Sequence, residues 1–250
     1  MAFPIFIEKA LGYVLPYAGL AFQATNESIP AIMEGLQIQQ GDRVLAVCGS
    51  GDQAFAMLEL ADYVTAVDSS KLQILYARCR LAQIKRGDFK RFYTLLSHCG
   101  SSAAYREQRS RYFTLSKLQT LKWKVDRLRL EREDMYKFSP RRIMEGRFNK
   151  IYLSNLLCYE GNSLRNNYSF LDMLASALPC GGLIYAISVG HGLSCGFSQE
   201  AGDLPLAVCD TALTNIARNT EIVRNTEGSS TCWNPTVFRR VKANLEGELI

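Results

Sequence analysis

The sequence has few residues of the kinds that usually form a structural metal site. It contains no cysteine pair spaced as CxxC and only two histidines, His98 and His191. Because structural zinc sites use closely spaced Cys and His ligands, this pattern argues against a metal site. Eight cysteines are present, and we expect all of them to be reduced, with those in apolar runs buried as free thiols. They are Cys48, Cys79, Cys99, Cys158, Cys180, Cys195, Cys209 and Cys232.

Long uncharged apolar runs are also missing. The first 22 residues are largely apolar, but Glu8 and Lys9 interrupt them and Pro4 and Pro16 break them. A basic segment of the kind that opens a secretory signal is absent there. No other segment approaches the 18 uncharged apolar residues that a transmembrane helix needs. We therefore expect a soluble, cytoplasmic protein.

Acidic residues are scarce in one part of the chain. Residues 71–150 contain 21 Lys and Arg against 7 Asp and Glu, a local net charge of +14, whereas the rest of the chain carries −9. A block of this sign favours an anionic partner. An anionic membrane surface, which would make the protein peripheral to the membrane, is the preferred reading, and nucleic acid is the less favoured one. A plain solvated helical surface explains the charge equally well.

What the chain does contain is a regular alternation of short apolar runs and segments with helical spacing. With 250 residues, 48% of them hydrophobic, the chain can bury a sizeable core. Strands are predicted at 43–48, 63–67, 125–132, 147–154, 183–188, 220–226 and 236–242, the last two as a hairpin. Helices are predicted within 5–37 and at 52–61, 70–86, 164–178 and 205–218.

This alternation predicts one doubly wound α/β domain spanning residues 1–250, with a mainly parallel sheet covered by helices on both faces. Residues 1–40 are expected to form a helical cap. Residues 87–122 are expected to form a basic helical insertion.

A glycine turn and a distant acid indicate the ligand. The strand at 43–48 leads into Gly49-Ser50-Gly51-Asp52, and Asp68, followed by Ser69, ends the next strand about twenty residues later. In doubly wound sheets this arrangement brings a carboxylate to the ribose of an adenosine. A dinucleotide would place its pyrophosphate at the helix start, beside Asp52. The negative charge of Asp52 suits the sulfonium and ammonium of S-adenosylmethionine better, so that cofactor is preferred.

Two further strand ends supply candidates. Asp134 follows the strand at 125–132 and could accept a hydrogen bond from the adenine amino group, with Met135 beside it. Asn155 follows the strand at 147–154 and could hold the amino-acid part of the cofactor or the nucleophile. Tyr159 could orient or deprotonate a nucleophile, and His191, between glycines, could be a general base. Capping or a plain loop would explain these residues without a ligand.

Longer stretches resemble a known family. "VLAVCGSGDQAFAMLELADYVTAVDSSKLQILYARCRLAQI", "GDFKRFYTLLSHCGSS" and "FNKIYLSNLLCY" are similar to the S-adenosylmethionine:diacylglycerol 3-amino-3-carboxypropyl transferases of betaine-lipid synthesis. The resemblance covers residues 40–190 and implies a class I methyltransferase-like fold. It also implies that the turn at 49–52 lines the methionine part, with Asp68 on the ribose. Asp134 and Met135 would hold the adenine, and Asn155 and Tyr159 would lie near the aminocarboxypropyl group.

Three functions remain open after the sequence analysis. The first is transfer of a 3-amino-3-carboxypropyl group to a hydroxyl or amine acceptor, a small molecule or a lipid, with methylthioadenosine as by-product. The second is methyl transfer to a small molecule or RNA. The third is a non-catalytic S-adenosylmethionine-binding module. The first two share one cofactor site and differ only in which carbon of the cofactor meets the nucleophile.

Overall fold

The fold was analysed in a computed structural model, which describes residues 21–95, 103–158, 164–189, 206–226 and 233–241. Its centre is one seven-stranded sheet with the strand order β3-β2-β1-β4-β5-β7-β6. The strands are β1 (Arg43–Val47), β2 (Tyr63–Asp68), β3 (Leu128–Arg132), β4 (Lys150–Ser154), β5 (Leu183–Val189), β6 (Ala207–Cys209) and β7 (Trp233–Arg240). Strands β1 to β5 are parallel, and β7 runs antiparallel to both β5 and β6.

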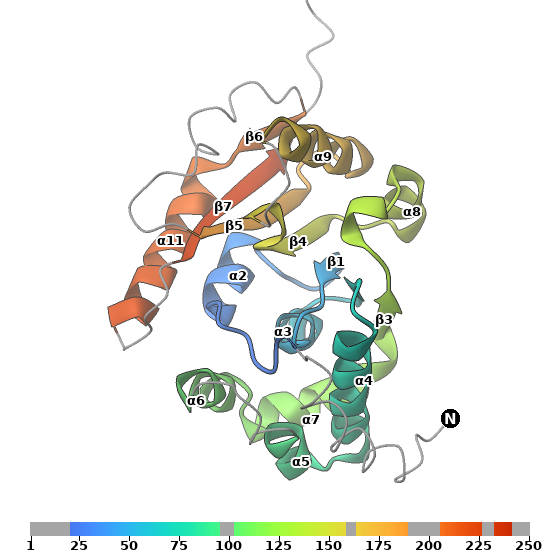
Figure 1. The fold of residues 1–250 in the computed structure, drawn as a ribbon, viewed down its shortest axis with the longest axis vertical. Helices are drawn as coiled ribbons and strands as arrows, with labels where there is room; N and C mark the ends of the chain where they lie inside the picture. Colours follow the sequence, from blue (N-terminus) through green and yellow to red (C-terminus); the bar gives the residue numbers. More distant parts are fainter. Residues whose placement is uncertain (1–20, 96–102, 159–163, 190–205, 227–232, 242–250) are drawn as a thin grey trace, which may run out of the picture.

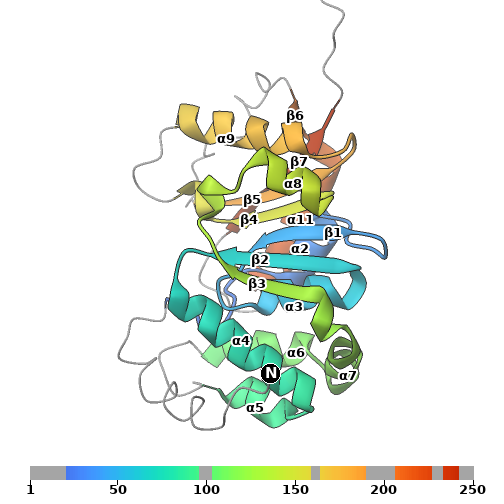
Figure 2. The ribbon, with the colours of Figure 1, turned by 90° about the vertical axis from the view of Figure 1, so that its right-hand side faces the viewer.

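Helices cover both faces of this sheet (Figures 1 and 2). They are α2 (Ile29–Gly35), α3 (Asp52–Leu60), α4 (Lys71–Arg86), α5 (Phe89–Thr94), α6 (Ala103–Tyr112), α7 (Leu115–Lys124), α8 (Pro140–Gly146), α9 (Leu164–Ala177) and α11 (Thr211–Thr226). One core cluster joins the sheet to α2, α3, α4 and α11, and a second joins it to α8 and α9. The sheet therefore confirms the predicted doubly wound, mainly parallel α/β arrangement.

The alternation of side chains along the strands explains why the sheet has a core cluster on each face. Along β1, Val44 and Ala46 belong to the first cluster, whereas Leu45, between them, belongs to the second. Successive side chains of a strand point to opposite faces, so an all-apolar strand serves both layers of helices. This is why the buried parallel strands read as continuous apolar runs in the sequence.

The segment predicted as a helical insertion contains, in the part that the structure describes, the three helices α5, α6 and α7. Helix α5 packs against α4, α7 packs against both α3 and α4, and α6 packs against α5. Phe92 of α5 is fully buried in the first core cluster. Its ring meets Phe55 of α3 edge-on at 5.9 Å and Phe113 at 5.4 Å. The insertion is thus part of the main core and not a separate appendage.

Two sequence predictions between residues 205 and 226 were wrong. Residues 220–226 form the end of α11 and not a strand, so the predicted terminal hairpin does not exist. The helix predicted at 205–218 begins only at Thr211, after strand β6. Leu213, Ala217 and Glu221 are all buried at a spacing of four, which is a helical repeat. The strand β7 instead inserts between β5 and β6.

Smaller boundary errors occur at three places. Val125–Arg127 is a 3-10 turn ahead of β3, and β4 begins at Lys150, not at residue 147. Of the helices predicted within 5–37, residues 1–20 lie outside the described residues, 21–28 are not helical, and α2 covers only Ile29–Gly35. No helix in the described ranges is both long and apolar enough to span a bilayer.

Candidate functional site

A cavity of about 410 Å³ lies where the strand order reverses direction, between β1 and β4. Such a switch point is the usual ligand site of a doubly wound sheet. The loops that follow β1, β2, β3 and β4 line the cavity at the carboxyl ends of these strands, and residues of the segment 21–27 complete it. The lining comes from 21, 22, 24–27, 47–50, 67–70, 133–136 and 154–156, with Gln53, Gln73 and Tyr152.

The turn after β1 brings the backbone close to any occupant of the cavity. Gly49 and Gly51 have positive φ angles of 49° and 86°, which favour glycine. A Cβ atom built on Gly49 would meet nothing within 4 Å, whereas one on Gly51 would lie 3.1 Å from the Phe55 ring. Gly49 and Ser50 line the cavity, and Gly51 is needed for packing against α3.

Asp68, at the end of β2, is fixed by two backbone donors. Its Oδ2 accepts from the Gly49 amide at 3.1 Å and its Oδ1 from the Ser70 amide at 2.8 Å. Burial raises the pKa of Asp68 above its ordinary value, and the hydrogen bonds from Ser70 and Gly49 oppose that shift. Each oxygen retains a lone pair for a further donor. Asp68 and Ser69 both line the cavity, beside the glycine turn.

The loop after β3 supplies a second pair of the predicted residues. Asp134 starts a short 3-10 turn (Met135–Lys137), accepts from the Tyr136 amide at 3.1 Å, and pairs with Lys137 at 3.6 Å. Met135 is 3% exposed. Both residues line the cavity on the side of β2, together with Glu133.

The end of β4 contains a cluster that sequence reasoning missed. The carboxylate of Glu27, from the segment ahead of α2, accepts hydrogen bonds from the hydroxyls of Tyr152 and Ser154. Ser154 has a φ of 56° and follows a register irregularity in β4, which indicates local backbone strain. Burial, and then the Glu27 charge, raises the pKa of Tyr152 well above its usual value, so its phenol stays a donor.

All of this cluster faces the same cavity. Glu27 is 2% exposed, and it lines the cavity with Tyr152, Ser154 and Asn155. In the sequence Glu27 stands in a turn before a helix, with no motif around it, so no signal marked it. Tyr159 and His191, predicted as catalytic groups, lie outside the described residues.

The lining of the cavity is acidic. Four carboxylates contribute to it, namely Glu27, Asp68, Glu133 and Asp134, and the described lining residues include no Lys or Arg. Glu133 is paired with Arg142 at 2.8 Å. An acidic, partly buried cavity favours a cationic ligand and disfavours a pyrophosphate. Within the described ranges no group of three His, Cys, Asp or Glu side chains could hold a metal ion.

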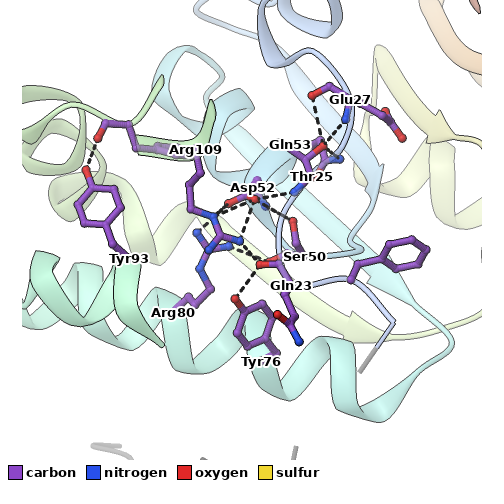
Figure 3. A network of polar contacts seen from close by, with 12 residues as sticks. Gln23, Thr25, Glu27, Ser50, Asp52, Gln53, Tyr76, Arg80, Tyr93 and Arg109 are labelled. Atoms are coloured by element: carbon purple, nitrogen blue, oxygen red, sulfur yellow. Dashed lines mark hydrogen bonds and ion pairs between the residues drawn. The ribbon is translucent and has the colours of Figure 1, made fainter. Parts of the chain in front are cut away.

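Asp52 does not line the cavity as the sequence suggested. It is fully buried and pairs with two arginines, Arg80 at 2.7 Å and Arg109 at 3.1 Å (Figure 3). Its Oδ2 also accepts from the Thr25 amide at 2.9 Å and from the Ser50 hydroxyl at 3.0 Å. The charge of Asp52 is therefore compensated inside the protein, and the preference for a cation comes from the cavity lining instead.

The segment 22–27 is tied to the protein by contacts from several elements. Gln73 of α4 donates to the carbonyls of Gly49 and Phe22, at 2.7 and 2.9 Å. Arg109 of α6 donates to the Gln23 carbonyl, and Trp233 of β7 donates to the Asn26 carbonyl at 2.7 Å. The insertion thus helps to hold the wall of the cavity in place.

Comparisons with known proteins give only distant likenesses. No protein-family model matches the chain, and no curated protein matches it. Similar solved structures include an rRNA methylase from Streptococcus thermophilus (TM-score 0.45, 7% identity, 86% of this chain and 95% of that one). Others are the N-methyltransferase NodS from Bradyrhizobium japonicum (0.43, 12%, 86% and 94%) and a SAM-dependent O-methyltransferase from Thermotoga maritima (0.44, 11%, 86% and 64%). Likenesses of this size say nothing about what this chain binds or transfers.

Proposed function

We propose that the cavity binds S-adenosylmethionine and that the chain is an S-adenosylmethionine-dependent methyltransferase. The observation that carries the proposal is an acidic cavity at the switch point, with Asp68 fixed at the end of β2 beside a glycine turn. The two ribose hydroxyls can donate hydrogen bonds to the free lone pairs of the Asp68 carboxylate. The positive charges of the cofactor match the carboxylates of the lining.

The residues present fit this cofactor at both ends. At the end between β2 and β3, Met135 offers an apolar surface for the adenine and Asp134 an acceptor for its amino group. At the other end, Gln53 lines the cavity, and its buried Oε1 has no hydrogen-bond partner among the described residues. Such an orphaned acceptor costs free energy unless a ligand donor reaches it. An ammonium group has three donors to offer.

S-adenosylmethionine, when bound, supplies an electrophilic carbon attached to a sulfonium leaving group. Glu27, close to Ser154 at the end of β4, is the group we assign to the acceptor. Its carboxylate takes the proton that an attacking hydroxyl or amine loses, while Tyr152 and Ser154 fix its orientation. Asn155, beside them, positions the acceptor. The methyl carbon is the least hindered electrophile of the three on the sulfur.

Transfer of the 3-amino-3-carboxypropyl group is the second candidate. The observation that favours it is the sequence resemblance of the insertion and of "IYLSNLL" at 151–157. For that reaction the site must present the γ-carbon of the methionine chain to the acceptor in line. A small molecule or a lipid would then be the acceptor.

The by-product of the reaction separates these candidates. Purified protein is incubated with S-adenosylmethionine and a cell extract, and the nucleoside product is identified by mass spectrometry. We expect S-adenosylhomocysteine, absent when the Asp68→Ala variant is used. Methylthioadenosine above the level seen with that variant would establish the second candidate. Cofactor binding with neither product in any extract would indicate a non-catalytic binding module, and no cofactor binding would refute the proposal.

Glu27→Gln is expected to lower kcat by roughly 10²- to 10⁴-fold, because a neutral amide cannot take the acceptor proton. Its affinity for the cofactor, measured by calorimetry, should change only a few-fold. The matched control is Glu34→Gln, since Glu34 is exposed on the adjoining helix α2 and accepts from Thr220 outside the cavity. Equal rates for Glu27→Gln and Glu34→Gln, with unchanged melting temperatures, would show that Glu27 is not the general base.

A further inference from the structure

Six exposed cations lie along one edge of the molecule, and we refer to them together as the basic strip. Three of them, Lys71, Arg78 and Lys85, are on α4 at intervals of seven residues. Seven residues are close to two helical turns, so these side chains share one face, with successive positions about 10 Å apart. The outward face of α4 therefore carries a row of cations over roughly 20 Å.

The other three cations, Arg127, Arg129 and Arg132, lie on or just before β3, the edge strand of the sheet. Three contacts align α4 and its preceding loop with β3, which Figures 1 and 2 show beside each other. Arg132 donates to the Ser69 carbonyl at 3.3 Å, Arg78 donates to the Leu130 carbonyl at 2.8 Å, and Lys85 pairs with Asp126 at 2.6 Å. The two rows therefore meet along the edge of the sheet, where Arg132 lies on the side of α4 and Arg129, between Leu128 and Leu130, points to the opposite side of β3.

The strip keeps an excess of positive charge. Among the described residues, three carboxylates pair with its members: Asp126 with Lys85, Asp62 with Arg127 at 3.9 Å, and Glu131 with Arg129. The Lys85–Asp126 pair is 61% and 82% exposed, so it is weak and easily exchanged for a stronger partner. Four of the six cations are arginines, whose planar donors match a phosphate group.

An exposed tryptophan extends the strip at its far end. Trp123, the ninth residue of α7, is 85% exposed, and it stands next to Lys122 and four residues before Arg127. At the near end the strip reaches the cavity, because Lys71 follows Ser70 and Arg132 precedes Glu133, both of which line it. Cations in a row with an aromatic side chain are the elements that bind a single-stranded nucleic acid.

We propose that the basic strip binds single-stranded nucleic acid, with phosphates along α4 and β3 and a base stacked on Trp123. A membrane surface fits less well. An interfacial helix inserts an apolar face into the bilayer, whereas the outward face of α4 presents a row of cations. Charges that merely protect an edge strand from pairing would be confined to β3. The row on α4 lies outside that strand. This binding requires neither the cofactor nor the proposed reaction.

The test is fluorescence anisotropy with a labelled 20-nucleotide RNA of mixed sequence, without cofactor, at several salt concentrations. The strip variant combines Lys71→Gln, Arg78→Gln and Arg132→Gln. The control variant, Lys90→Gln with Arg111→Gln and Arg141→Gln, removes the same charge from exposed positions on α5, α6 and α8. We expect the strip variant to bind at least tenfold more weakly at low salt. The slope of log Kd against log salt should fall by about 2, since each lost phosphate contact removes about 0.7.

Trp123→Ala should weaken RNA binding roughly tenfold while leaving the salt slope unchanged, because stacking is not ionic. Equal losses in the strip and control variants would overturn the proposal, since binding would then follow net charge alone. Absence of RNA binding by the unmodified protein would overturn it too. Sedimentation with vesicles containing phosphatidylserine, abolished in the strip variant, would assign the strip to a lipid surface if RNA fails to bind.

Discussion

Asp68→Ala is expected to weaken S-adenosylmethionine binding by roughly 10²- to 10⁴-fold. In the proposed complex the substitution removes two hydrogen bonds from ribose hydroxyls to a charged acceptor, each contributing about 1.5–3 kcal/mol. It also removes the acceptor that holds the amides of Gly49 and Ser70, so the glycine turn loses its fixed position. Isothermal titration calorimetry with the cofactor measures the effect.

Asp126→Asn is the matched control for this variant. Asp126 lies at the opposite end of β3 from the cavity, its side chain is 82% exposed, and it pairs only weakly with Lys85. Its substitution should leave the dissociation constant unchanged. An Asp68→Ala protein that is folded and binds the cofactor as tightly as the Asp126→Asn protein would show that Asp68 does not hold the ribose.

The pH dependence of binding gives the same residue a second test. Burial raises the pKa of Asp68 above its ordinary value of 3.8. In the proposed complex the ionised form accepts hydrogen bonds from the ribose, so affinity should be full at neutral pH and fall as the pH drops through that raised pKa. The loss should therefore begin at a higher pH than an ordinary aspartate would give. Asp68→Asn should remove this dependence.

The fold was largely predictable because its signals are local. Each buried parallel strand is a short apolar run, and the glycine turn and Asp68 stand in consecutive loops whose ends meet at one edge of the sheet. The prediction failed where the local pattern fits two structures. The sequence around Ile222 reads as a strand, yet Leu213, Ala217 and Glu221 continue the buried face of α11 into it.

The site was predictable only where residues follow a strand. Asp68, Asp134 and Asn155 occupy such positions, and all three line the cavity. Glu27 reaches the cavity through contacts with residues more than a hundred positions away, and no local pattern encodes those contacts. Asp52 shows the converse case. Its position suggested a ligand, but its carboxylate is paired with Arg109, which lies on α6, 57 residues later in the chain.

That burial makes Asp52 a strong determinant of stability, and Asp52→Asn is expected to reduce the free energy of unfolding by about 3–5 kcal/mol. Arg80 and Arg109 are both buried, and the substitution leaves two guanidinium charges together without their carboxylate. Domains typically have only about 5–15 kcal/mol of stability, so the loss should be evident in urea unfolding followed by circular dichroism. Asp126→Asn, at an exposed pair, should cost less than about 1 kcal/mol.

The dependence of the free energy of unfolding on pH, measured in acid, gives Asp52 a second test. Burial by itself would raise the pKa of Asp52, but Arg109 and Arg80 outweigh it and lower the pKa from 3.8 to about 2. A depressed pKa means that the contribution of the ionised group, roughly 2 kcal/mol, is complete above pH 4 and is lost as the pH falls toward 2. Asp52→Asn should flatten the curve in that window, whereas Asp126→Asn should leave it unchanged. Equal curves for the Asp52→Asn and unmodified proteins would mean that the two arginines do not depend on Asp52, and that α6 holds the segment 22–27 without it.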